Sequence, residues 1–192
     1  MQSKLDLDLF AWYADEVVYR ADGMLEFHRL LKNYACIGKM PGATPVDPFS
    51  LLRHKRMDRY MIETLLMHAA GLSLLFFPAA KGVHRRRGEK LRELFEVGDE
   101  SPLGNRDLRN ALLHTDERLD GFFKGYEKVR DGILTHFSLP QESTFGIGMD
   151  GFTAEWYEGK LSMEEGANLL AEARRVKAKA AMHIPALGLR NA

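Results

Sequence analysis

The sequence has one cysteine, Cys36, and no excess of either charge. A single cysteine cannot form an internal disulfide, and a cysteine-based zinc site would need thiolates that the chain lacks. Lysine plus arginine and aspartate plus glutamate each number 27, so no overall field attracts nucleic acid or a membrane. Any contact with RNA or DNA must therefore come from local basic patches. The single cysteine fits a reducing compartment, and we expect a cytoplasmic protein.

Long hydrophobic runs are also missing. The longest covers residues 72–80, is interrupted by Ser73 and Pro78, and is far shorter than the roughly 20 residues that a membrane-spanning helix needs. Residues 1–8 lack the basic region and apolar run of a secretory signal. We therefore expect no membrane partner.

Signatures of metal enzymes and common hydrolases are absent as well. The seven histidines form no H-x-x-x-H or E-x-x-H pair on a predicted helix, which argues against a zincin or a di-iron bundle. There is no G-x-S-x-G motif, and Cys36 has no recognisable histidine partner. The glycine cluster at residues 145–151 lacks a Walker lysine, so we interpret it as a loop. We expect no metal and no cofactor.

What the chain contains is the pattern of a helical protein. Its 192 residues, 45% of them hydrophobic, are enough to bury a core. Helical spacing predicts one helix over residues 5–36, with Gly23 as a candidate break, and a second from Pro48 to residue 77. The end of the second helix, from residue 72, is apolar nearly all round and is predicted to be fully buried, either in the core or in a subunit contact. A short third helix is predicted over residues 88–97.

The second half of the chain predicts a helix, a hairpin and a last helix. Asn105 is the predicted N-cap of a helix that runs to Gly121 or Gly125. Residues 152–161 have the pattern of a small hairpin, and a capping box at residues 162–165 opens a final helix. We predict a mainly α fold, a helical bundle with a small C-terminal β-hairpin and a final helix, in a single domain over residues 1–192.

One stretch of the predicted fourth helix carries chemistry. Asn110 and His114 are four residues apart, so they share a helix face and the amide can orient the imidazole. Arg109 lies about 100° from Asn110 and roughly 140° from His114 around the helix axis. A site that uses Arg109 and His114 together must lie in a cleft beside this helix, or be completed by a second copy across a dimer interface. A surface histidine that pairs only with its helix neighbours is the plainer alternative.

This pattern of arginine, polar residue, three further residues and histidine resembles the HEPN superfamily (higher eukaryotes and prokaryotes nucleotide-binding domains). The resemblance rests on Arg109, Asn110 and His114 and on the helical layout, and it covers residues 5–130, while residues 131–192 hold the hairpin and final helix. It implies a homodimer with a composite site in which Arg109 and His114 are catalytic and Asn110 orients. It also implies either a toxin–antitoxin or phage-defence role, with an antitoxin protein as partner, or a member that has lost catalysis.

The residue types suit RNA cleavage without a metal. A histidine that titrates near neutrality can transfer protons to and from ribose oxygens, and an arginine fork matches phosphate oxygens. One histidine cannot easily perform both transfers, so a two-fold partner would supply the second. The predicted substrate is single-stranded or loop RNA, whose 2′-hydroxyl is accessible. The alternative is a catalytically inactive helical module that binds a nucleotide, RNA or a protein.

Two basic clusters are candidates for RNA binding. The first lies on the predicted second helix and comprises Arg53, Arg56 and Arg59; the second precedes the third helix and comprises Arg85, Arg86 and Arg87. Arginines recruit phosphates whatever the base sequence. Both clusters could equally be solvated surface.

Overall fold

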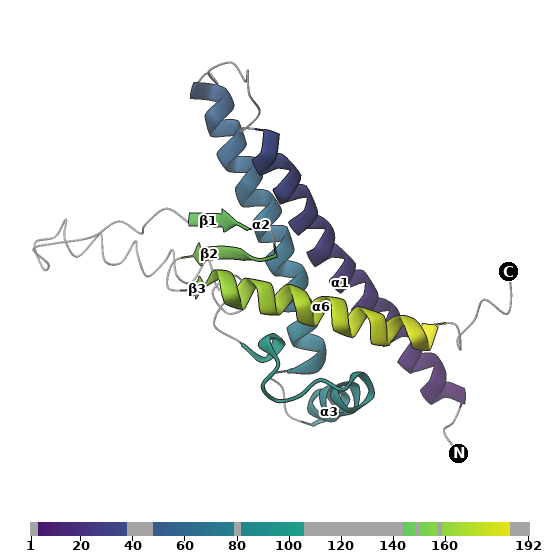
Figure 1. Cartoon of the computed structure of the whole chain (residues 1–192). Coiled ribbons are helices and arrows are strands. Elements are labelled where there is room, and N and C mark those ends of the chain that lie inside the picture. The colour runs from purple at the N-terminus through teal and green to yellow at the C-terminus, as the bar shows by residue number, and fades with distance from the viewer. Residues whose placement is uncertain are drawn as a thin grey trace, which may run out of the picture.

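The computed structural model describes residues 4–37, 48–78, 82–105, 144–148, 150–156 and 159–184. In chain order the elements are α1 (Lys4–Ile37), α2 (Pro48–Phe76), α3 (Val83–Phe95), the 3-10 helix η1 (Pro102–Gly104), β1 (Thr144–Ile147), β2 (Phe152–Trp156), β3 (Gly159–Leu161) and α6 (Met163–His183). The prediction of a mainly helical fold with a small C-terminal hairpin and a final helix is confirmed (Figure 1). None of the helices in these stretches is long and apolar enough to cross a membrane.

The two long helices α1 and α2 lie side by side and run in opposite directions (Figure 1). Arg20 of α1 lies on Gly71 of α2, and Gly23 lies on His68, so the residue numbers advance in opposite senses along the contact. The prediction of one helix here is confirmed, because α1 continues through the candidate break at Gly23. A Cβ at position 23 would overlap the His68 ring, so glycine serves here to let the two helices approach closely.

A single core joins α1, α2, α3 and α6. On α1 the buried residues recur every three or four positions, as the pattern predicts: Ala14, Val17, Ala21, Met24, His28 and Leu31. On α2 the buried positions include Met61, Ile62, Leu65, Leu66, Ala69 and Leu72. On α6 they are Leu169, Leu170, Ala173, Val176 and Ala180. At the end of α2, Leu72 and Phe76 lie in this core, whereas Leu74 is 39% exposed in the single chain, so its burial in a subunit contact stays a prediction.

The third helix begins earlier than predicted. It starts at Val83 rather than at residue 88, so the basic run lies in its first turn. Gly82 precedes the helix with a positive φ of 73°, a conformation that favours glycine. At the other end Glu96 adopts the left-handed conformation, and its backbone N–H bonds back to the last turn.

The small sheet has three antiparallel strands in the order β1-β2-β3. The predicted hairpin of β2 and β3 is confirmed, with Ala154 opposite Leu161. The interpretation of residues 145–151 as a loop was wrong in its first half, because β1 pairs with β2 there and Ile147 lies opposite Phe152. The short turn between them is closed by a hydrogen bond from Gly148 N to Gly151 O.

The final helix α6 begins at the predicted capping box. Ser162 Oγ accepts from Glu165 N, and Glu165 Oε2 accepts from Ser162 N at 2.7 Å. Along its length α6 packs on α1, where Lys177 forms an ion pair with Asp22. The final helix α6 therefore completes the core by covering one side of α1.

Candidate functional site

The predicted catalytic residues Arg109, Asn110 and His114 lie outside the residues that the structure describes. The nearest described residue is Asn105, which ends η1 with an extended backbone at φ −65° and ψ 117°. Asn105 is also the predicted N-cap of the next helix, and that predicted helix lies outside the described residues. The roles of the catalytic residues stay predictions.

The predicted arginines of α2 have a described backbone but no described side chains. Arg53, Arg56 and Arg59 are all in the first half of α2, at intervals of three residues. Residues three apart on a helix are neighbours on its surface. RNA contact by this row stays a prediction.

The side chains of the second basic cluster are described, and its three arginines have different contacts. Arg87 donates a hydrogen bond from Nη2 to the carbonyl oxygen of Leu74 at 2.9 Å, and its guanidinium lies 5.7 Å from the centre of the Tyr13 ring. Arg85 donates to Glu89 Oε1 at 2.8 Å in an exposed ion pair. Arg86 is exposed and has no ion-pair partner among the described residues. Arg87 therefore holds α3 to α1 and α2, while Arg85 and Arg86 face solvent.

The start of α3 suits a phosphate group. No side chain caps the first turn of the helix, so its free backbone N–H groups point outwards. His84, Arg85 and Arg86 are exposed around it. Positive side chains and the positive end of the helix dipole both attract an anion. Because an exposed ion pair contributes little, Arg85 can leave Glu89 for a phosphate at small cost.

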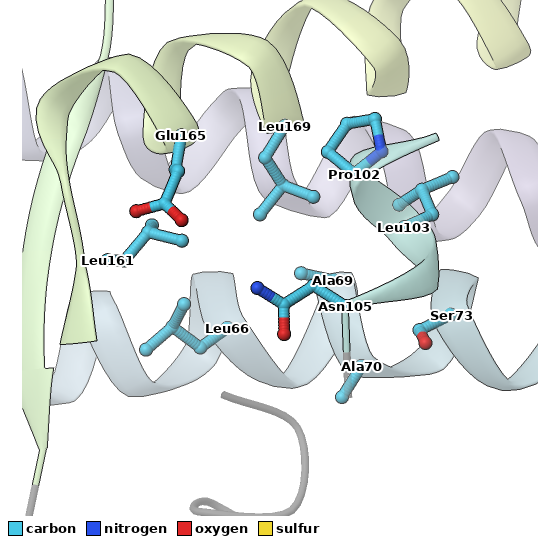
Figure 2. A pocket seen from close by; sticks show the side chains of 10 residues that line it. All are labelled: Leu66, Ala69, Ala70, Ser73, Pro102, Leu103, Asn105, Leu161, Glu165 and Leu169. Atoms are coloured by element: carbon cyan, nitrogen blue, oxygen red, sulfur yellow. The ribbon is translucent and has the colours of Figure 1, made fainter. Parts of the chain in front are cut away.

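A separate pocket lies between α2, η1, β3 and α6 (Figure 2). Its volume is about 140 Å³, which is close to that of a cavity that holds a benzene ring. Its lining is mainly apolar: Leu66, Ala69, Ala70, Ser73, Pro102, Leu103, Asn105, Leu161, Glu165 and Leu169. Figure 2 shows the Asn105 carboxamide between α2 and Leu169 of α6.

The pocket is better suited to binding than to catalysis. Glu165 is the one titratable residue in its lining, and it is occupied by the capping box. The backbone and side-chain hydrogen bonds of Ser162 hold the pKa of Glu165 below its ordinary value. A carboxylate held in this way is a poor general base. The pocket can accept a small apolar group beside the Asn105 amide.

No family model, curated protein or solved structure matches the chain. The resemblance to the HEPN superfamily therefore rests on Arg109, Asn110, His114 and the helical layout.

Two histidines outside the predicted site, His28 and His68, pack between elements of the fold. His28 is buried, its Nε2 lies 3.2 Å from the carbonyl oxygen of Gly151, and its ring lies beside Phe152. Since a carbonyl only accepts, Nε2 carries the proton and the neutral imidazole donates. Burial lowers the pKa of His28, against the opposing effect of the Gly151 hydrogen bond. His28 thus anchors the sheet to α1.

His68 lies between α1 and α2. Its ring contacts Tyr19 edge-on at 5.5 Å and stacks on Phe27 at 6.1 Å between ring centres. Its Nδ1 is buried without a hydrogen-bond partner among the described residues. Burial, and then the charge of Arg20, lower its pKa. Across the described stretches no three histidine, cysteine or acidic side chains are grouped as metal ligands.

Proposed function

We propose that the protein is a metal-independent endoribonuclease of HEPN type that cleaves single-stranded or loop RNA at a site shared by two copies of the chain. The proposal is carried by the spacing of Arg109, Asn110 and His114 in a mainly helical chain. The absence of a metal signature in the sequence and its single cysteine agree with this chemistry in a cytoplasmic setting. A toxin–antitoxin or phage-defence role, with an antitoxin as partner, belongs to the same proposal.

The chemistry follows from the residue types. His114 of one protomer takes the proton of the ribose 2′-hydroxyl, and the oxygen attacks the adjacent phosphorus. The bond from phosphorus to the 5′-oxygen breaks, and His114 of the other protomer gives that oxygen a proton. Arg109 binds the phosphate oxygens while they carry the extra charge. Asn110 holds the imidazole in orientation, and the first product ends in a cyclic phosphate.

The start of α3 supports RNA binding in this proposal. Arg85, Arg86 and the uncapped helix end offer a place for a phosphate outside the cleavage site. A few such contacts give a modest dependence of binding on salt. This agrees with a chain whose net charge is zero.

The test is cleavage of a mixed RNA pool by the purified protein in excess chelator. We expect cyclic-phosphate ends with the wild type and loss of cutting with His114→Ala. His183→Ala is a matched control, because it removes a histidine on α6 that belongs neither to the motif nor to the basic start of α3. Cutting that survives His114→Ala, or that vanishes in chelator, would overturn the proposal.

The runner-up function is an inactive helical module that binds a nucleotide, RNA or a protein. The mainly apolar pocket beside Asn105 favours this second function, because its lining can hold a small apolar group and offers no free acid or base for catalysis. Stable RNA binding without turnover would favour this second function over the first.

A further inference from the structure

Exposed hydrophobic side chains gather on one side of the molecule. Of the ten large hydrophobic residues that are exposed in the described part, seven belong to α1 and α2. They are Trp12, Tyr19 and Leu30 of α1, and Met57, Tyr60, Met67 and Leu74 of α2. We call these seven residues the outer face. Trp12 is 75% exposed and Tyr60 is 60% exposed, which is unusual for aromatic side chains in a folded protein.

The spacing of these residues is regular. On α2, Tyr60, Met67 and Leu74 are seven residues apart, and on α1 the same interval separates Trp12 from Tyr19. A repeat of seven places side chains in one row along a helix, and such rows form the contact between packed helices. The row on α2 lies opposite the residues that enter the core, such as Leu65 and Leu72. On α2 the outer face is therefore a second apolar side of the helix, opposite the side that enters the core.

The two rows form a continuous surface. Tyr19 of α1 contacts the ring of His68, the neighbour of Met67 in the chain. Arg20 lies over the Tyr19 ring at 5.5 Å and also against Gly71 of α2. The charge of Arg20 is balanced by Glu16, to which its Nε donates at 2.6 Å. The middle of the outer face is thus joined across the helix pair. Its described charges are paired, Arg20 with Glu16 and, next to Leu30, Arg29 with Glu26.

The size of the outer face fits a protein contact. With roughly 200 Å² of surface for each large side chain, the exposed fractions of the seven residues correspond to about 700 Å². The largest apolar patch on a typical monomer covers about 300–600 Å². A stable interface covers about 800 Å² on each partner. The outer face alone approaches that area.

We propose that two copies of the chain associate through the outer face, with the α1–α2 pair of one copy packed on the same pair of the other about a two-fold axis. A largely apolar surface whose described ionic groups are paired within each copy is complementary to itself, and a two-fold contact brings the same patch together twice. An acidic or basic partner would need an opposite charge that the middle of this face lacks. The proposal does not depend on ribonuclease activity, because it stands on exposure and spacing alone.

The test is the mass of the protein in solution, measured by sedimentation over a wide range of concentration. We expect a dimer for the wild type and at least a tenfold weaker dimer for Met67→Lys. The two-fold contact would bury the introduced lysine of each copy in an apolar interface, where the two positive charges repel each other. Met182→Lys is the matched control, because Met182 is 65% exposed on α6 and lies outside the outer face. We expect this control to remain dimeric, and circular dichroism to show equal helicity for all three proteins.

A second readout locates the contact. The chain has two tryptophans, Trp12 and Trp156, so a Trp156→Phe variant reports Trp12 alone. We expect its emission to shift to the blue as the dimer forms. A monomeric wild type, or a dimer unaffected by Met67→Lys with constant Trp12 emission, would overturn the proposal. Dimerisation without RNA cleavage would leave it intact and count against the nuclease only.

Discussion

Ser101 Oγ donates a hydrogen bond of 2.7 Å to Glu172 Oε1, 71 residues further along the chain. Glu172 also accepts from Arg175 Nε and Nη2, at 2.7 and 2.8 Å. Arg175 in turn donates from Nη1 to the carbonyl oxygen of Phe95 at 3.2 Å. One carboxylate on α6 therefore fixes both η1 and the end of α3.

This carboxylate gives a prediction about acid stability. The Arg175 hydrogen bonds, aided by Ser101, hold the pKa of Glu172 below its ordinary value of 4.5. Its contribution to the free energy of unfolding is thus present above pH 4.5 and is lost as the pH falls through the lowered pKa. We expect Glu172→Gln to reduce stability by about 1–3 kcal/mol at pH 7.

Urea denaturation at pH 7 and at pH 3 measures the effect. The difference between Glu172→Gln and wild type should shrink at the lower pH. Glu93→Gln, at an exposed position on α3, serves as the control and should change little. A difference of equal size at both pH values would contradict the prediction.

The contact of Gly23 with His68 predicts an unusual effect of alanine. In most helices alanine is more stable than glycine by about 1 kcal/mol. At position 23 the added Cβ meets a ring that is held between two aromatic residues, so we expect Gly23→Ala to destabilise by about 1–3 kcal/mol.

Gly71→Ala is the comparison for this substitution. There the new Cβ meets only the flexible side chain of Arg20, which can move aside. Thermal melts should show a lower Tm for Gly23→Ala and an equal or higher Tm for Gly71→Ala. If both variants gained stability, the tight contact at His68 would be refuted.

The histidines His28 and His68 predict a second pH dependence near neutrality. Burial lowers the pKa of both below the ordinary value of 6.5, so unfolding takes up protons. Stability should therefore decrease as the pH falls from about 6.5 through the lowered values and be level above that range. The free energy of unfolding, measured from pH 8 to pH 5, should have a smaller slope in His28→Gln. An unchanged slope would show that His28 titrates normally in the folded protein.

Neighbouring arginines on α3 predict opposite phenotypes. Arg87→Ala removes the hydrogen bond to Leu74 and the contact with Tyr13, so we expect a loss of about 1–2 kcal/mol of stability. Arg86→Ala should leave stability unchanged and weaken RNA binding, with the salt slope reduced by about one. Thermal melts and fluorescence anisotropy at several salt concentrations distinguish them. Equal RNA affinity of Arg86→Ala and wild type would exclude Arg86 from the RNA contact.

Local patterns predicted much of the fold. Apolar spacing identified α1 and α2, proline marked the start of α2, and the capping box placed the start of α6. These signals lie within a few residues of what they determine. The start of α3 was placed five residues too late because glycine and arginines suggested a loop or a helix entry, although Gly82 with its positive φ lies just before the helix.

Contacts between residues far apart in the chain could not be predicted from the sequence. Nothing local to Gly23 indicates that His68 will lie against it, or that Ser101 will reach Glu172. The apolar run from residue 72 left open whether Leu74 enters the core or a subunit contact, since such a run does not reveal which of its sides a neighbour covers. The motif of Arg109, Asn110 and His114 was visible in sequence, and its geometry lies outside the described residues.

The packing of α6 on α1 bears on how the chain is made in a cell. Until α6 leaves the ribosome, the side of α1 that carries Ala14, Val17 and Ala21 has no final cover. Contacts of such long sequence separation form slowly and leave apolar surface open meanwhile. Nascent chains that end before Val176 should be held by chaperones or degraded. A premature stop within the segment that encodes α6 is thus expected to remove the protein rather than to shorten it.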